Sequence, residues 1–180
     1  NHPDTVRAST RAHVAQVIAD LGFVPNGSAR QLKAGRSSIV AFLAIDTANP
    51  FFADVARGVE EEIRRRGLSL FLCNSDKSAE RESEYLANLT ELRVRGVLIT
   101  AINLDNPRIR QIRDSGSAVV IVDRVLDADA LDWCAVGVDD VAGGDLAVEH
   151  LIERGHRRFA YIGGPRELRQ VADRLRGAEL

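Results

Sequence analysis

Apolar and polar positions alternate regularly from residue 38 to the end of the chain. Short, nearly continuous runs of aliphatic and β-branched residues predict strands buried on both faces of a sheet. Between them, apolar residues recur every three or four positions, which predicts amphipathic helices. The expected strands are 38–46, 68–74, 96–102, 118–123, 135–139 and 159–163, and the expected helices are 53–66, 80–95, 107–115 and 142–154.

This strict alternation predicts the α/β class, with a doubly wound parallel sheet and right-handed crossovers. The run at 159–163 starts close to the end of the chain, so few neighbours remain for it to pair with. It either joins the same sheet or opens a second lobe.

The first 36 residues show a different pattern. Val14, Val17, Ile18 and Leu21 share one helical face, and Gly22 follows as a C-terminal cap. A second helical stretch at 28–34 has only about two turns, which are not stable alone in water. We therefore expect a small all-α region at 1–36 whose short helix folds on a partner, followed by a separate domain at 37–180.

Charge separates the same two regions. The whole chain has a formal net charge of −2, and residues 1–36 have a net charge of +3 because five basic residues outnumber two acidic ones. The remaining residues therefore carry −5, and the basic end indicates an anionic partner. The basic residues are Arg7, Arg11, Arg30, Lys33 and Arg36.

The overall composition, 45% apolar and 28% charged, is typical of a globular domain. No apolar run approaches the ~18 residues of a membrane span, and the first residues do not show the pattern of a secretory signal. Cys73 and Cys134 lie in apolar, strand-like runs, so we interpret both as small buried hydrophobic residues rather than as a disulfide.

Motifs of enzymes, cofactors and metal sites are missing. The sequence contains no G-x-G-x-x-G after the first strand, no phosphate-binding loop and no G-x-S-x-G elbow. Its four histidines lack metal-site spacing. We expect no enzyme activity, no cofactor and no metal. Gly143-Gly144 and Gly163-Gly164 are interpreted as turn and close-packing glycines.

The ends of the expected strands are unusually polar and aromatic. Asp46 and Asn49-Pro50-Phe51-Phe52 follow the first strand, Asp123-Arg124 follow the fourth, and Asp139-Asp140 follow the fifth. Ligands of open α/β sheets bind beyond these carboxyl ends. The convergence favours a cleft for a polyol or a base. Alternatively, the acids are caps and turns, and both phenylalanines pack beneath the helix.

An ordered set of motifs resembles the LacI/GalR family of transcriptional repressors. The resemblance covers essentially the whole chain. It rests on Thr10-Arg11, 21–26, 29–32, Asn49-Pro50-Phe51-Phe52, 95–99, 122–124, 150–158, 162–165 and 174–177. The chain departs from the family pattern at Ala178, where an aromatic residue is usual. It also begins after the recognition helix and stops early in the second lobe, so we expect an internal piece of a regulator.

The resemblance implies a homodimer that binds palindromic operator DNA through a hinge helix in the minor groove. Leu32 matches the apolar residue inserted between base pairs. Asn26 matches the start of the hinge, and Ala29 and Lys33 match flanking minor-groove positions. Together with Arg30, these residues form the expected DNA-binding set. Helices 53–66 and 80–92 would form much of the dimer contact.

The resemblance also implies a small-molecule effector, a sugar or related metabolite, bound in a periplasmic-binding-protein-like domain. Phe52 matches the ring-stacking position, and Arg174 matches an arginine that clamps the effector from the second lobe. The first lobe would be 37–157 and the second would begin at 158–180. The remaining cleft positions are Asn49, Phe51, Asp123, Arg124 and Asp139.

The function implied is that of a cytoplasmic, effector-controlled transcriptional regulator without a membrane partner. The alternative is a periplasmic-type sugar-binding protein of the same body fold, but the basic hinge segment argues against it. An enzyme on a flavodoxin-like sheet is a third possibility, disfavoured by the missing motifs.

Overall fold

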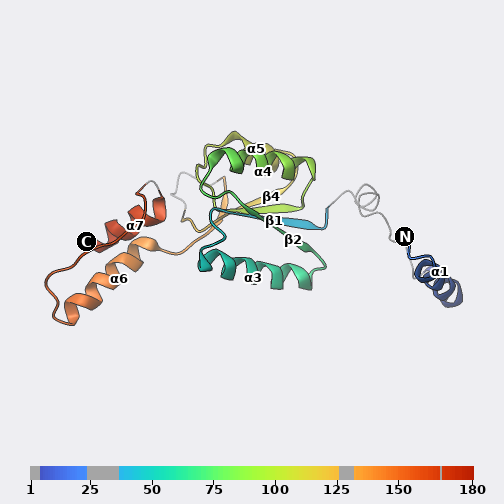
Figure 1. Ribbon diagram of the computed structural model, residues 1–180, viewed down its shortest axis with the longest axis horizontal. Coiled ribbons are helices and arrows are strands. Elements are labelled where there is room, and N and C mark those ends of the chain that lie inside the picture. The colour runs from blue at the N-terminus through green and yellow to red at the C-terminus, as the bar shows by residue number, and fades with distance from the viewer. Residues whose placement is uncertain (1–4, 24–36, 126–131, 167) are drawn as a thin grey trace. The chain divides into compact units, whose positions relative to one another are not determined.

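The structure is a computed structural model that describes residues 5–23, 37–125, 132–166 and 168–180. The chain divides into two compact units, Asn1–Arg36 and Ser37–Leu180. Figure 1 shows the elements of both units.

The first unit contains helix α1, Ala8–Asp20. Gly22 follows with a φ of +58°, and the amide of Phe23 donates to the carbonyl of Ile18 at 3.0 Å. A left-handed conformation at this position favours glycine, because glycine has no Cβ. The helix and its C-terminal glycine are therefore confirmed. The short helix expected at 28–34 lies outside the described residues.

The second unit is built on a five-stranded parallel sheet in the order β2-β1-β3-β4-β5. Order reverses at β1, which pairs with β2 on one side and β3 on the other, so the sheet is doubly wound as the sequence predicts. The strands are β1 (Ile39–Ala44), β2 (Ser69–Asn74), β3 (Gly96–Ile99), β4 (Ala118–Val122) and β5 (Cys134–Val136).

Helices cover both faces of the sheet. Helix α3 (Pro50–Arg65) lies on one face, and α4 (Ala79–Glu91) and α5 (Pro107–Asp114) lie on the other (Figure 1). Alternate residues of β1 serve the two cores: Leu43 belongs to the cluster with α4 and α5, and Phe42 belongs to the cluster with α3. This burial on both faces explains why β1 has a continuous apolar sequence.

One buried carboxylate supports the α4 side of the fold. Glu82, in the first turn of α4, is almost fully buried. It accepts hydrogen bonds from the backbone amide of Ile102 at 2.9 Å and from the side-chain amide of Asn106 at 3.0 Å. These two bonds tie the segment after β3 to α4.

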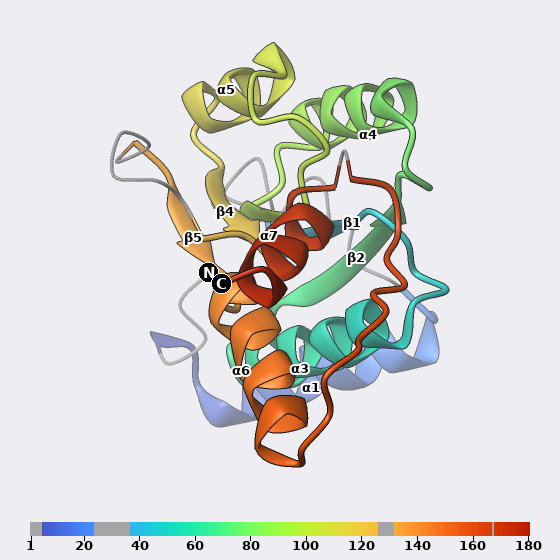
Figure 2. The ribbon, with the colours of Figure 1, turned by 90° about the vertical axis from the view of Figure 1, so that its left-hand side faces the viewer.

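Helices α6 (Asp140–Glu153) and α7 (Arg169–Ala178) pack side by side (Figures 1 and 2). Their backbones approach closely at two glycines. A Cβ at Gly144 would meet the carbonyl oxygen of Arg174, and a Cβ at Gly177 would meet that of Val141. The interpretation of Gly144 as a close-packing glycine is confirmed, whereas Gly143 has nothing within 4 Å of a Cβ.

Two predictions from the sequence were wrong. Residues 159–163 form no strand in the described part of the chain, and Ile162 is 97% exposed. Strand propensity alone does not form a strand, and this segment lies beside the packed helices α6 and α7 instead of beside the sheet. Cys134 is exposed rather than buried, because it lies on the edge strand β5, whose side chains are uncovered.

Cys73 is buried as expected, and this burial raises the pKa of its thiol to about 11. Within the described ranges, we find no helix with the length and apolar character needed to span a membrane.

Candidate functional site

Asp123 is a buried polar residue at the carboxyl edge of the sheet. It follows β4 and has a φ of +61°. Its backbone amide donates to the carbonyl of Val136, the last residue of the neighbouring strand β5, at 2.8 Å. It is only 8% exposed. The side-chain amide of Gln170 donates to the Asp123 carboxylate at 2.8 Å and to its carbonyl oxygen at 3.1 Å. A residue of α7 therefore lies directly on the end of β4.

The surroundings of Asp123 raise the pKa of its carboxyl above the ordinary value. The largest cause is burial, because a charged carboxylate loses hydration there. The hydrogen bond from Gln170 opposes this effect and lowers the pKa. The negative charge of Asp140 raises it again, and the positive charge of Arg174 lowers it.

Asp139 and Asp140 start helix α6. The Asp139 carboxylate accepts from the backbone amide of Ala142 at 3.0 Å, so it caps the helix as the alternative interpretation of these acids expects. Asp140 pairs with Arg174 of α7, with 2.7 Å between the Asp140 Oδ1 and the Arg174 Nε. This ion pair connects the two helices.

The end of β1 is held by local bonds. Asn49 caps α3 by accepting from the amide of Phe51 at 3.0 Å. Asp46 pairs with Lys77 at 2.9 Å, and the hydrogen bond from Lys77 is the main reason that the pKa of Asp46 is lowered. Both groups shape the loop where α3 begins.

The two adjacent phenylalanines have different surroundings. Phe52 is 5% exposed and packs in the core beneath α3, whereas Phe51 is 41% exposed. Their rings meet edge to face, with centroids 5.1 Å apart. In this arrangement Phe51 is the ring with a face available to a ligand.

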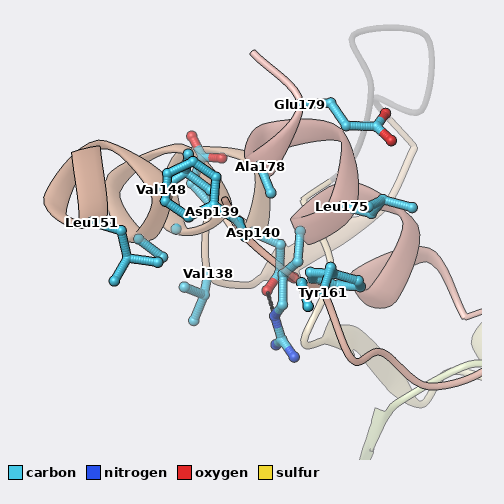
Figure 3. Close-up of a pocket in the computed structure, with 15 residues that line it drawn as sticks. Val138, Asp139, Asp140, Val148, Leu151, Tyr161, Leu175, Ala178 and Glu179 are labelled. Carbon is cyan, nitrogen blue, oxygen red and sulfur yellow. Dashed lines mark hydrogen bonds and ion pairs between the residues drawn. The ribbon is translucent and has the colours of Figure 1, made fainter. Parts of the chain in front are cut away.

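A cavity of about 130 Å³ lies at the ends of β4 and β5, and Asp123, Arg124 and Asp139 line it together with Gln170. A larger cavity of about 630 Å³ lies beside α6 and α7, lined by Asp139 and Arg174 among mostly apolar residues such as Leu151 and Leu175 (Figure 3). Asn49, Phe51 and Phe52 line neither of these two cavities.

The structure thus brings together four of the seven expected effector residues. Gln170 was missed from the sequence, although it lies one helical turn before Arg174 and therefore on the same side of α7. The expected DNA-binding residues Asn26, Ala29, Arg30, Leu32 and Lys33 lie outside the described residues. In the described part of the chain, no three His, Cys, Asp or Glu side chains are grouped to hold a metal ion.

Comparison with known proteins identifies the family. Residues 37–179 match the model of the periplasmic binding proteins and sugar binding domain of the LacI family. The chain belongs to this family. The match covers the whole sheet and both helices α6 and α7.

Individual relatives of the LacI-family domain are regulators by name. The HTH-type transcriptional repressor PurR of Aliivibrio fischeri is 32% identical over 175 residues, which are 97% of this chain and 51% of the relative. The ribose operon repressor of Escherichia coli is 32% identical over 179 residues, or 96% and 52%.

A solved structure agrees with these relatives. The transcriptional regulator CelR in its cellobiose complex is 30% identical, with a TM-score of 0.68 over 97% of this chain and 52% of that one. The chain therefore spans about half the length of the LacI-family relatives that it matches.

Proposed function

We propose that this chain belongs to a sequence-specific DNA-binding transcriptional regulator, a repressor whose operator affinity is controlled by a small-molecule effector. The effector is a sugar or a related metabolite, and the regulator works in the cytoplasm, where operator DNA lies. The observation that carries the proposal is the polar site at the ends of β4 and β5, where the buried Asp123 meets a residue of α7. The names of the relatives favour a regulator over a periplasmic-type sugar-binding protein or an enzyme.

The chemistry of this site suits a polyhydroxylated ligand. A carboxylate accepts hydrogen bonds from sugar hydroxyls, and an arginine donates to ring and hydroxyl oxygens. Asp123 and Asp139 supply the acceptors, Arg124 and Arg174 supply the donors, and Asn49 marks the start of α3 at the end of β1. For stacking on a sugar ring we propose Phe51, with Phe52 supporting it from the core.

We propose that helix α6 belongs to the second lobe together with α7. The expected boundary at 157 would separate these two helices, although they pack on each other through Gly144 and Gly177. A boundary in the connection between β5 and α6 keeps the pair intact.

A homodimer is proposed through the edge of β2 and the neighbouring helices α3 and α4. Apolar side chains on an exposed edge strand are usually covered. Phe71 and Leu72 of β2 are 46% and 47% exposed. Sedimentation velocity should show a dimer for the parent protein and a monomer for Leu72→Glu; a Leu72→Glu variant with unchanged sedimentation would contradict this surface.

Sugar binding is tested by thermal shift of the purified protein with D-ribose, cellobiose and a wider set of mono- and disaccharides. A sugar at one hundred times its Kd should add about 2.7 kcal/mol of stability, a rise in Tm of about 5–11 °C. Asp123→Ala should abolish the shift. Asp114→Ala, which removes an exposed carboxylate of α5, should leave it intact. A panel without any shift would contradict the sugar class.

DNA binding is tested at Leu32. In a gel-shift titration of the intact regulator with an operator selected from genomic fragments, Leu32→Ala should weaken binding by removing the wedge that kinks the duplex. Equal operator affinity for the parent protein and the variant would exclude this role.

A further inference from the structure

We propose that Gln170 is an internal competitor of the effector: its side-chain amide occupies the Asp123 carboxylate in the unliganded protein and must leave before a sugar binds. The proposal rests on the proposed function. We call the contact between Gln170 and Asp123 the latch.

The geometry of the contact is that of a ligand substitute. The Gln170 Nε2 lies 2.8 Å from the Asp123 Oδ2 and 3.1 Å from its carbonyl oxygen, so one amide donates to a carboxylate oxygen and to the backbone carbonyl of the same residue. A sugar hydroxyl would donate to the same oxygens. A buried carboxylate is costly to leave unsatisfied, so one donor must replace the other.

The available space supports competition rather than joint binding. Small-molecule sites usually have volumes of about 300–1,000 Å³. The cavity beside Asp123 and Gln170 has about 130 Å³. A sugar therefore does not fit at the Asp123 carboxylate while the amide is in place, and its entry requires α7 to withdraw.

The latch is coupled to α6 as well as to α7, because the two helices pack against each other. Gly144 and Gly177 allow α6 and α7 to pack with their backbones in contact. The Arg174–Asp140 ion pair adds a second connection at the same end of α6. Packed helices of this kind move together. Release of Gln170 thus frees the α6–α7 pair from the end of β4, which turns effector binding into a movement of one lobe.

The variants separate the hydrogen bond from the space that the side chain fills. Gln170→Met keeps the length of the side chain but has no N–H donor, whereas Gln170→Ala also removes its volume. The matched control is Gln111→Met, because Gln111 is exposed on α5 and its side-chain oxygen accepts from Arg108 of the same helix.

Calorimetric titration of the purified protein with the sugars above gives the first readout. Removing an internal competitor raises the fraction of binding-competent protein. We expect Gln170→Met and Gln170→Ala to bind the sugar about tenfold more tightly, the size of one charged hydrogen bond, and Gln111→Met to match the parent protein. Weaker or unchanged binding in both Gln170 variants would overturn the latch.

Hydrogen exchange of the unliganded protein gives a second readout that needs no sugar. The amides of Val171 and Ala172 bond to the carbonyl of Leu168 in the first turn of α7, next to the latch. They should exchange several-fold faster in Gln170→Met and at the parent rate in Gln111→Met. Unchanged exchange in Gln170→Met would refute the latch even if no sugar in the panel binds, whereas the failure of every sugar to bind the parent protein refutes only the proposed effector class.

Discussion

The close packing of α6 and α7 predicts that alanine has different effects on stability at the adjacent glycines Gly143 and Gly144. A Cβ at Gly144 would lie far inside van der Waals contact with the Arg174 carbonyl oxygen and 3.0 Å from the Ala178 amide nitrogen. Both obstacles are backbone atoms, so no rotamer change relieves them. Gly144→Ala therefore forces the helices apart by on the order of 1 Å.

The magnitude follows from two opposing effects. Overpacking of this kind costs about 1–3 kcal/mol. Alanine in place of glycine within a helix gains about 1 kcal/mol. Gly143→Ala is the matched control, because a Cβ there has nothing within 4 Å and only the helix gain applies. The difference between the two variants isolates the overpacking cost of about 1–3 kcal/mol.

The assay is urea unfolding followed by circular dichroism, with thermal melting as a second measure. Gly143→Ala should be more stable than the parent protein, and Gly144→Ala should melt about 2–12 °C below Gly143→Ala. Because Asp139 caps α6 and Arg174 lies on α7, Gly144→Ala should also weaken sugar binding. If Gly144→Ala were as stable as Gly143→Ala, the close packing of the two helices would be refuted.

Three further predictions concern single side chains. Burial raises the pKa of Asp123, so the folded state binds the carboxyl proton more tightly than the unfolded state does, and the stability from that proton is lost as the pH rises through the folded pKa. Asp123→Asn should therefore be more stable than the parent protein in urea unfolding near pH 7. The difference should be smaller below the ordinary pKa of 3.8. Phe52→Ala should cost about 3–5 kcal/mol, while Phe51→Ala should cost about 1 kcal/mol yet weaken sugar binding in calorimetry; a larger loss of stability at Phe51 would reverse their assignment. Glu82→Ala removes the acceptor of two hydrogen bonds, one of them from the backbone amide of Ile102, and should cost at least about 2 kcal/mol in thermal or urea unfolding. The exposed Glu84→Ala should cost less than about 0.5 kcal/mol; equal losses would contradict the role of Glu82.

The sequence predicts the inner sheet well because its strands are buried on both faces. Continuous apolar runs such as those of β1 and β3 have no other stable position in an α/β fold. The strand ends are less certain from sequence: the run at 38–46 is paired only over Ile39–Ala44, and the residues after it form the loop that leads into α3.

The errors come from features that depend on neighbours. Residues 159–163 have the composition of a strand, but they lie beside α6 and α7 instead of beside an edge of the sheet. Cys134 has an apolar neighbourhood in the sequence, which does not reveal that β5 is an edge strand. Gln170 resembles an ordinary exposed helix residue, and only the docking of α7 on β4 shows its contact with Asp123.

The most direct test of effector control is the reciprocity between sugar and operator. The affinity of the intact regulator for a sugar that binds it is measured by calorimetry with and without the operator duplex. Its operator affinity is measured with and without that sugar. If sugar and operator favour different arrangements of the protein, the operator changes the sugar affinity by about 5- to 150-fold and the sugar changes the operator affinity by the same factor. Equal sugar affinities in the presence and absence of operator would contradict effector control.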